Sequence, residues 1–220
     1  MYSAGAKTGV ETTFFGKVMA FFALAVFASA AGVYFTNEYF MGYFFSSPAL
    51  MWVLFIAELV LIFSSRAWSK KEPLNRFLFA AFAFITGITI APLLGIVAAT
   101  PGGVAIISKA LLATGLMFSA TAIIGYTTKM DLSGLRGGLF VGLIGMIIVG
   151  ILGFFIPWGN TMEMVYSGIG VLLFSGFTAY DFQKIKHYPH DEYINAAMSL
   201  YLDIFNLFVF ILRLIMSSRD

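Results

Sequence analysis

The chain has 220 residues, of which 60% are hydrophobic and 11% are charged, and its mean hydropathy is +0.92. This composition excludes an ordinary water-soluble domain, in which about 25% of residues are charged. The formal net charge is only +2, and the basic residues stand between apolar runs, which argues against a nucleic-acid surface. Cysteine is absent, so disulfides, thiolate metal sites and cysteine nucleophiles are excluded. We therefore predict an all-α integral membrane protein.

Seven apolar stretches are long enough to cross a bilayer as helices. In chain order they are Phe14–Phe35, Ala49–Ser65, Phe77–Ala99, Val104–Tyr126, Gly137–Phe155, Met162–Ile185 and Tyr193–Met216. Polar, Pro-containing or Gly-containing segments separate them, beginning with Asn37 and Glu38. None of these connections is longer than a loop, so we predict one domain, residues 1–220, in which seven transmembrane helices form a bundle.

The basic residues of the connections predict the orientation of the chain in the membrane. One side carries Lys7, Lys17, Arg66, Lys70, Lys71, Arg76, Lys129, Arg136, Lys184 and Lys186. The opposite connections carry Glu38 and Glu163 without Lys or Arg, although Arg213 and Arg219 near the end of the chain break the rule. We expect the basic side and the N-terminus in the cytosol, the C-terminus outside, and a bacterial inner membrane as the location.

Small residues and one proline mark places where helices pack or bend. Gly138 and Gly142 form a GxxxG pattern, and Gly115, Ser119 and Gly125 mark the fourth span. We interpret these glycines as helix-packing positions. Pro92 lies inside the third span, where it permits either a bend satisfied by neighbouring helices or a gating hinge.

Asp203 is the residue on which the functional prediction depends. It lies ten residues after Tyr193, or about 15 Å at 1.5 Å per residue, which is close to the centre of a bilayer. An unpaired charge at that depth costs about 3 kcal/mol or more, so Asp203 should face protein, a partner or water. Ser199 and Asn206 lie on the same helical face. These oxygen-bearing groups suit Ca²⁺, whereas a hydrogen-bonded seam between helices would need no ion.

Asp181 lies near the cytosolic end of the sixth span, on the helix that runs antiparallel to that of Asp203. The two carboxyls are therefore expected to meet. If they share a proton, the pair titrates as a unit. A protonated pair would hold the two helices together, whereas an ionised pair would repel or would recruit a cation or a basic side chain.

Three further polar features have less specific interpretations. Glu58, in the middle of the second span, is either a protonated, hydrogen-bonded residue or part of an ion path. Lys109 can extend its ammonium group to the outer interface, so no role is assigned to it. His187 and His190 flank a proline and predict a solvated turn, not a metal site.

Three segments resemble the transmembrane Bax inhibitor motif family, in its bacterial branch. They are TGITIAPLLG in the third span, AYDFQKIKH at the end of the sixth and SLYLDIFNLFVFILR in the seventh. The resemblance covers nearly the whole chain. It implies a seven-helix bundle whose last helix is surrounded by the other six, and a pH-sensitive calcium leak activity. It also implies that Asp181 and Asp203 form a proton-sensing pair that closes the pore and binds Ca²⁺ transiently.

The resemblance implies two further properties. A basic residue at the cytosolic end of the second span contacts the first aspartate in the family, and its nearest match is Arg66, with Ser69 and Lys70 as alternative positions. Some bacterial relatives bind a membrane-anchored ATP-dependent protease and modulate it. Regulation of such a protease is therefore the alternative function. The expected surroundings are the lipid bilayer, with no cofactor, and a monomer is favoured.

An intramembrane aspartyl protease is the competing enzyme class. Tyr180-Asp181 on the sixth helix and Asp203 on the seventh follow its outline, and two carboxylates sharing a proton suit peptide hydrolysis. However, Asp203 lies in LYLD, whereas the protease pattern requires GxGD, and Pro48-Ala49-Leu50 precedes the second span, which is the wrong place for the PAL tripeptide. Neither Ser167 nor Ser175 lies in a serine-hydrolase motif. We therefore predict that the chain is not an enzyme.

Overall fold

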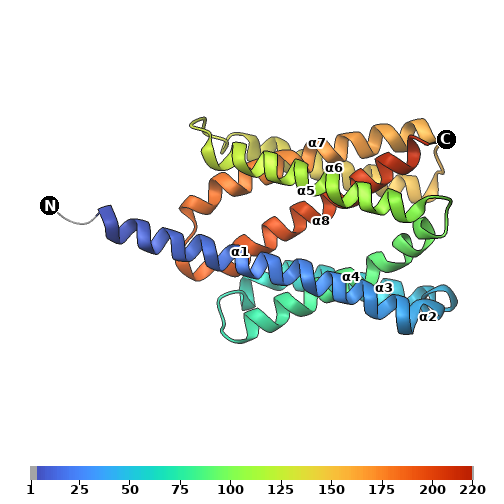
Figure 1. Cartoon of the computed structure of the whole chain (residues 1–220), viewed down its shortest axis with the longest axis horizontal. Coiled ribbons are helices and arrows are strands. Elements are labelled where there is room, and N and C mark those ends of the chain that lie inside the picture. Colours follow the sequence, from blue (N-terminus) through green and yellow to red (C-terminus); the bar gives the residue numbers. More distant parts are fainter. Residues whose placement is uncertain (1–3, 220) are drawn as a thin grey trace. The chain divides into compact units, whose positions relative to one another are not determined.

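The computed structural model describes the backbone of residues 4–219 and the side chains of residues 13–43, 47, 49–153 and 155–219. Its elements are α1 Ala4–Phe35, the π-helical η1 Thr36–Phe40, α2 Met41–Ser46, α3 Pro48–Trp68, α4 Leu74–Ala98, α5 Gly103–Thr127, α6 Leu135–Phe155, α7 Asn160–Lys184, the 3-10 helices η2 Ile185–His187 and η3 His190–Glu192, and α8 Tyr193–Ser217 (Figure 1). Residues 4–219 contain no strand. The prediction of an all-α fold is confirmed.

Among the residues that the structure describes, seven helices are long and apolar enough to cross a membrane, as predicted. The six later spans begin and end within a few residues of the predicted bounds. The prediction of a connection at Asn37 and Glu38 is wrong, because η1 and α2 continue the helical path from α1 as far as Ser46. Polar residues at the end of a membrane helix can keep helical geometry, because their side chains reach the interface.

Pro92 lies inside α4, which continues without a break from Leu74 to Ala98. A proline removes one backbone donor from a helix, and neighbouring groups can satisfy the carbonyl that this leaves without a partner. The helix therefore accommodates Pro92, and the gating hinge stays a prediction.

The chain divides into two compact units. Residues 1–101 and 188–201 make up unit 1, and residues 102–187 and 202–220 make up unit 2. The helix α8 contributes its first part to unit 1 and the remainder to unit 2. Of the seven spans found among the described residues, it has the largest buried share, 44%. A single domain over residues 1–220 stays a prediction.

In unit 1, α1 packs along α4, and α3 packs on another side of α4 (Figure 1). The backbones of α1 and α4 approach closely, because a Cβ atom at Gly87 would overlap the carbonyl of Ser29. The first part of α8 packs on α4 through Tyr201, whose ring contacts Phe79 and Phe82 edge to face at 6.2 and 5.9 Å. Small residues therefore bring α1 onto α4, and aromatic residues attach α8.

In unit 2, α5 and α6 both pack on α7. A Cβ atom at Gly125 of α5 would overlap the carbonyl of Ala179, so this glycine is required by a close approach of two helices, as predicted. In the GxxxG pattern, Gly142 faces Leu173, but a Cβ atom at Gly138 would meet no atom within 4 Å. A Cβ atom at Gly115 of α5 would also meet no atom within 4 Å, so the packing roles predicted for Gly138 and Gly115 are wrong within this unit.

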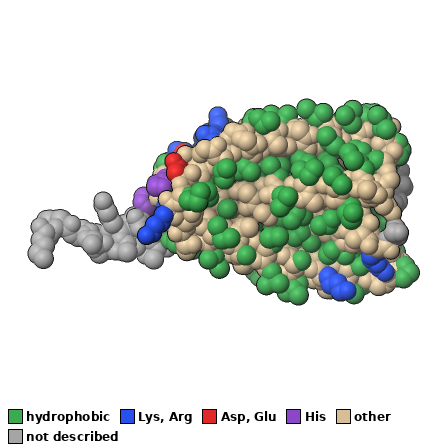
Figure 2. Space-filling view, turned by 90° about the horizontal axis from the view of Figure 1, so that it is seen from above, with side chains coloured by type: hydrophobic (Ala, Val, Ile, Leu, Met, Phe, Trp, Pro, Cys, Tyr) green, Lys and Arg blue, Asp and Glu red, His purple; other side chains and the backbone are tan. Residues whose placement is uncertain are grey.

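Large apolar side chains lie on the surface, as a bilayer-facing protein requires. Figure 2 shows hydrophobic side chains spread over the face in view, with few charged ones among them. Phe27 is 74% exposed and Phe63 is 80% exposed. Such exposure is unfavourable in water and favourable in lipid.

Candidate functional site

Asp181 and Asp203 form a pair of buried carboxyls inside unit 2. Asp181 lies in the last turn of α7 and is 8% exposed, and Asp203 lies in the middle of α8 and is 4% exposed. The two groups are close enough to interact electrostatically. Among the described residues, Asp203 Oδ2 has no hydrogen-bond partner. This electrostatic interaction agrees with the predicted proximity of the two carboxyls, and their role as a proton-sensing pair stays a prediction.

The packing of α7 on α8 positions this pair. Gly170, Phe174 and Asp181 follow one another at intervals of four and seven residues, which places them on one face of α7. On α8, Phe210 lies seven residues after Asp203 and thus on the same face. Phe210 stacks on Phe174 with ring centroids 5.7 Å apart. This contact sets an antiparallel register in which Asp203 lies beside Asp181.

Ser199 and Asn206 accompany Asp203 on α8. Both are half-buried. The side-chain amide of Asn206 donates a 2.7 Å hydrogen bond to the carbonyl of Leu202 in its own helix. Their role towards Ca²⁺ stays a prediction.

The described part of the chain holds no group of three or more His, Cys, Asp or Glu side chains arranged to bind a metal ion. His187 and His190 are exposed in the 3-10 helices η2 and η3, as predicted for a solvated turn.

Glu58 lies in unit 1 on α3 and is half-buried. Its Oε1 accepts a 2.7 Å hydrogen bond from the hydroxyl of Thr89 on α4. This contact supports the first of the two predicted interpretations, a hydrogen-bonded residue at a helix interface. The second interpretation, a place in an ion path, stays a prediction.

The two candidate basic residues after Glu58 behave differently. Arg66 is exposed in the last turn of α3, and the structure shows no ion pair for it among the described residues. Lys70 forms ion pairs of 2.9 Å with Asp191 and with Glu192, both just before α8. These ion pairs raise the pKa of Lys70 above its ordinary value. The predicted contact of Arg66 with Asp181 stays a prediction.

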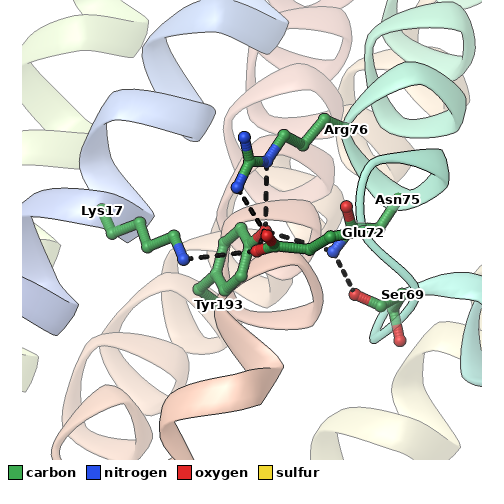
Figure 3. Close-up of polar contacts among 6 residues, drawn as sticks. All are labelled: Lys17, Ser69, Glu72, Asn75, Arg76 and Tyr193. Carbon is green, nitrogen blue, oxygen red and sulfur yellow. Dashed lines mark hydrogen bonds and ion pairs between the residues drawn. The ribbon is translucent and has the colours of Figure 1, made fainter.

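Unit 1 also contains a cluster of polar side chains that the sequence analysis did not predict. Figure 3 shows side chains from α1, α4 and α8 converging on the carboxylate of Glu72. Tyr193, the first residue of α8, donates a 2.5 Å hydrogen bond to Glu72 Oε1, and Arg76 donates one of 2.8 Å to Oε2. The ammonium group of Lys17 lies 3.5 Å from Oε1 and 3.7 Å from the centre of the Tyr193 ring. We call Lys17, Glu72, Arg76 and Tyr193 the Glu72 cluster.

The Glu72 cluster attaches the beginning of α8 to α1 and α4. The hydroxyl of Tyr193 also accepts a 3.2 Å hydrogen bond from Asn75, whose side-chain amide donates a second one, of 2.9 Å, to the carbonyl of Ser69. One signal could have indicated part of it, because Glu72 and Arg76 have the i, i+4 spacing of a helical ion pair. The contact with Tyr193 spans 121 positions and has no local signal.

The comparisons with known proteins agree with this architecture. The sequence model of the family described as "Inhibitor of apoptosis-promoting Bax1" matches residues 11–220. The chain belongs to the Bax inhibitor family. It is thus a multi-pass membrane protein with seven apolar helices.

Relatives in this family come from bacteria, plants and viruses. An uncharacterized membrane protein of Streptococcus pyogenes serotype M3 is 34% identical over 214 residues, which cover 91% of each chain. A BI1-like protein of Arabidopsis thaliana is 34% identical over 77% of this chain and 66% of its own length. A Golgi anti-apoptotic protein of Vaccinia virus (strain Lister) is 33% identical over 79% of this chain and 71% of its own length. That the present chain is not an enzyme and uses no cofactor stays a prediction.

Proposed function

We propose that the chain is a pH-sensitive, calcium-permeable leak channel in which Asp181 and Asp203 sense protons. The observation that carries this proposal is that two buried carboxyls on α7 and α8 are close enough to interact electrostatically. A buried carboxylate is costly in a membrane protein and marks a proton or ion path more often than a structural contact. Family membership supports a membrane function without specifying which one.

The pair can act as a switch because its charge determines how α7 and α8 interact. With one proton shared, the two carboxyls hydrogen-bond and hold the helices together. With both groups ionised, they repel each other, and a cation between them removes the repulsion. Calcium, the cargo, would then bind briefly to Asp181 and Asp203, with the oxygen atoms of Ser199 and Asn206 near it on α8.

The proposal places the chain in a bacterial inner membrane with its N-terminus in the cytosol and its C-terminus outside. Two contacts support this orientation. Lys17 and Arg76, both assigned to the cytosolic side, meet at Glu72 within unit 1. In unit 2, Arg213 pairs with Glu163 near the beginning of α7, at the end of that helix away from Lys184. Arg213, a basic residue on the side that should lack basic residues, thus has its charge paired by Glu163.

Calcium flux measured in liposomes tests the proposal. Wild-type protein, reconstituted with a trapped calcium indicator, should show calcium influx whose rate changes with pH. Asp203→Asn removes the shared proton site, and its influx should lose that pH dependence. A variant with an unchanged pH profile would show that the pair does not control permeation. Glu38→Gln, an exposed carboxyl, serves as the control variant.

Regulation of a membrane-anchored ATP-dependent protease is a second candidate function. The apolar 18-residue centre of α3 contains no buried residue, so this helix can contact a partner helix as well as lipid. Affinity purification from native bacterial membranes should then recover the protease, and Trp52→Ala and Phe63→Ala on the exposed face should reduce its recovery. If the protein admits calcium in liposomes and the purification recovers no protease, this second function is wrong and the channel function stands.

A further inference from the structure

Phe210 ends the polar face of α8. From Ser199 through Asp203 to Asn206, this face carries oxygen-bearing side chains, and the next residue on it is Phe210. At 1.5 Å per residue, Phe210 lies about 10 Å beyond Asp203 along the helix. It is 8% exposed, so its ring points into the protein. A cation leaving the carboxyl pair along this face of α8 meets that ring.

The ring of Phe210 fills a notch on α7 and closes the space between the two helices. Gly170 forms the floor of the notch, because a Cβ atom at this position would overlap the ring. Phe174 stacks on one side of Phe210, with centroids 5.7 Å apart and planes at 23°. Tyr166 contacts it from the next turn, with centroids 5.6 Å apart and planes at 63°. Three aromatic rings thus form an apolar layer at this level of unit 2.

Tyr166 is itself held in place, which fixes this layer. Its hydroxyl donates a 2.9 Å hydrogen bond to the carbonyl of Met146 on α6. The indole ring of Trp158 lies against it, with centroids 5.5 Å apart. Phe210 can therefore leave the notch more readily than Tyr166 can move, because no hydrogen bond holds the phenyl ring.

Charged groups appear again on the far side of the layer. Glu163 and Arg213 form an ion pair of 3.5 Å, and the indole N–H of Trp158 donates a 2.8 Å hydrogen bond to Glu163. Along the contact of α7 with α8, a carboxyl pair and an ion pair thus lie on either side of an aromatic layer. Polar groups at both ends of an apolar constriction are the arrangement of a hydrophobic gate, where a narrow apolar segment excludes water and ions.

We propose that Phe210 is a hydrophobic gate that blocks the ion path between the Asp181/Asp203 pair and the Glu163 end of α7. This inference rests on the proposed channel function and extends it with a second barrier. The carboxyl pair sets the pH at which the path opens, and the Phe210 ring keeps the path dry until it leaves the Gly170 notch. Gly170 is a positioning residue for the gate.

Two substitutions with the same branched side-chain shape separate a gate from a packing residue. Phe210→Leu and Phe210→Asn leave side chains with the same number of heavy atoms, but only the polar Asn allows water into the constriction. In calcium-indicator liposomes, at the pH where wild-type influx is slowest, Phe210→Asn should raise influx severalfold and Phe210→Leu should stay near wild type. The pH midpoint should be kept in both, because the carboxyl pair is intact. Equal influx from the two variants, or no rise in either, overturns the proposal.

A second comparison covers the case in which Phe210→Asn does not fold. Gly170→Ala adds one methyl group where the ring lies and should displace it, which should raise influx at the same pH. Gly168→Ala is the matched control on α7, because its Cβ atom would meet no atom within 4 Å. If Gly170→Ala and Gly168→Ala show the same calcium influx, the proposal that Phe210 is a gate is wrong.

The same liposomes separate the failure of this inference from failure of the channel itself. If Asp203→Asn abolishes the pH dependence while Phe210→Asn and Gly170→Ala behave as wild type, the channel stands and the gate is wrong. If neither wild type nor any variant admits calcium, both are wrong.

Discussion

Tyr193 and Glu72, at the beginning of α8 and just before α4, are joined by a 2.5 Å hydrogen bond that the tyrosine hydroxyl donates. This bond and the one from Arg76 lower the pKa of the Glu72 carboxyl to about 2. Glu72 therefore stays ionised at physiological pH. The beginning of α8 is attached by a contact that does not respond to physiological pH.

Glu72→Gln should destabilise the protein in a pH-dependent way. Because the folded-state pKa of Glu72 is lowered, its contribution is fully present above the ordinary carboxyl pKa of 4.5 and is lost as pH falls towards about 2. The difference in melting temperature between wild type and variant should be constant from pH 8 to about 5 and shrink below that. The effect should be small, because Glu72 is exposed. Thermal unfolding in detergent measures it.

A difference that instead changed between pH 6 and 8 would contradict this assignment of the Glu72 pKa. Tyr193→Phe is the companion variant. It removes the hydroxyl and keeps the ring that lies against Lys17, so its melting temperature should fall less than that of a Tyr193→Ala variant.

Gly125→Ala should lower the free energy of unfolding by about 1–3 kcal/mol, the usual cost of overpacking. The added methyl group would overlap the carbonyl of Ala179, and the α5 and α7 backbones would have to separate. Gly115→Ala in the same helix is the control, because its Cβ atom would meet nothing within 4 Å. That control should be neutral or should stabilise by up to about 1 kcal/mol through helix propensity. Equal effects in the two variants would show that α5 and α7 are not in close contact at Gly125.

Thr89→Val should destabilise the contact between α3 and α4 by about 1 kcal/mol, because Glu58 loses its 2.7 Å hydrogen bond while the side-chain shape is kept. Thr89→Ser should restore most of the loss, since the hydroxyl returns. Unfolding in detergent measures both. If Thr89→Val and Thr89→Ser have the same stability, the hydrogen bond to Glu58 does not stabilise the contact between α3 and α4. That result would favour the interpretation of Glu58 as part of an ion path.

Gln183 of α7 should stabilise the loop between α5 and α6. Its side-chain oxygen accepts a 2.8 Å hydrogen bond from the amide of Leu132, and its side-chain nitrogen donates one of 2.7 Å to the carbonyl of Met130. Gln183→Leu breaks both bonds, so trypsin should cleave after Lys129 faster than in wild type. Cleavage at an unchanged rate would mean that other contacts hold the loop.

The sequence was sufficient for the number of spans and for the bounds of six of them, and it singled out Asp181 and Asp203. Asp203 stands out because a charge interrupts an apolar run, and the antiparallel order of the last two spans brings Asp181 to it. Phe210 could not be predicted, since an apolar residue in an apolar helix carries no signal of its own. Tyr193 was missed because tyrosine is common at membrane interfaces, and nothing near it in the chain points to Glu72. The end of α1 was misjudged because Asn37 and Glu38 resemble a loop.

The shared proton is the central claim, and infrared difference spectroscopy tests it most directly. With isotope-labelled aspartate, wild-type protein titrated across the pH range of calcium influx should show the carbonyl band of a protonated buried carboxyl appear and disappear. Asp181→Asn and Asp203→Asn should each shift the midpoint of the remaining group, because each carboxyl loses the neighbour with which it shares the proton. If the remaining aspartate titrates at an unchanged pH in both variants, the two carboxyls act independently and the account of the switch is wrong.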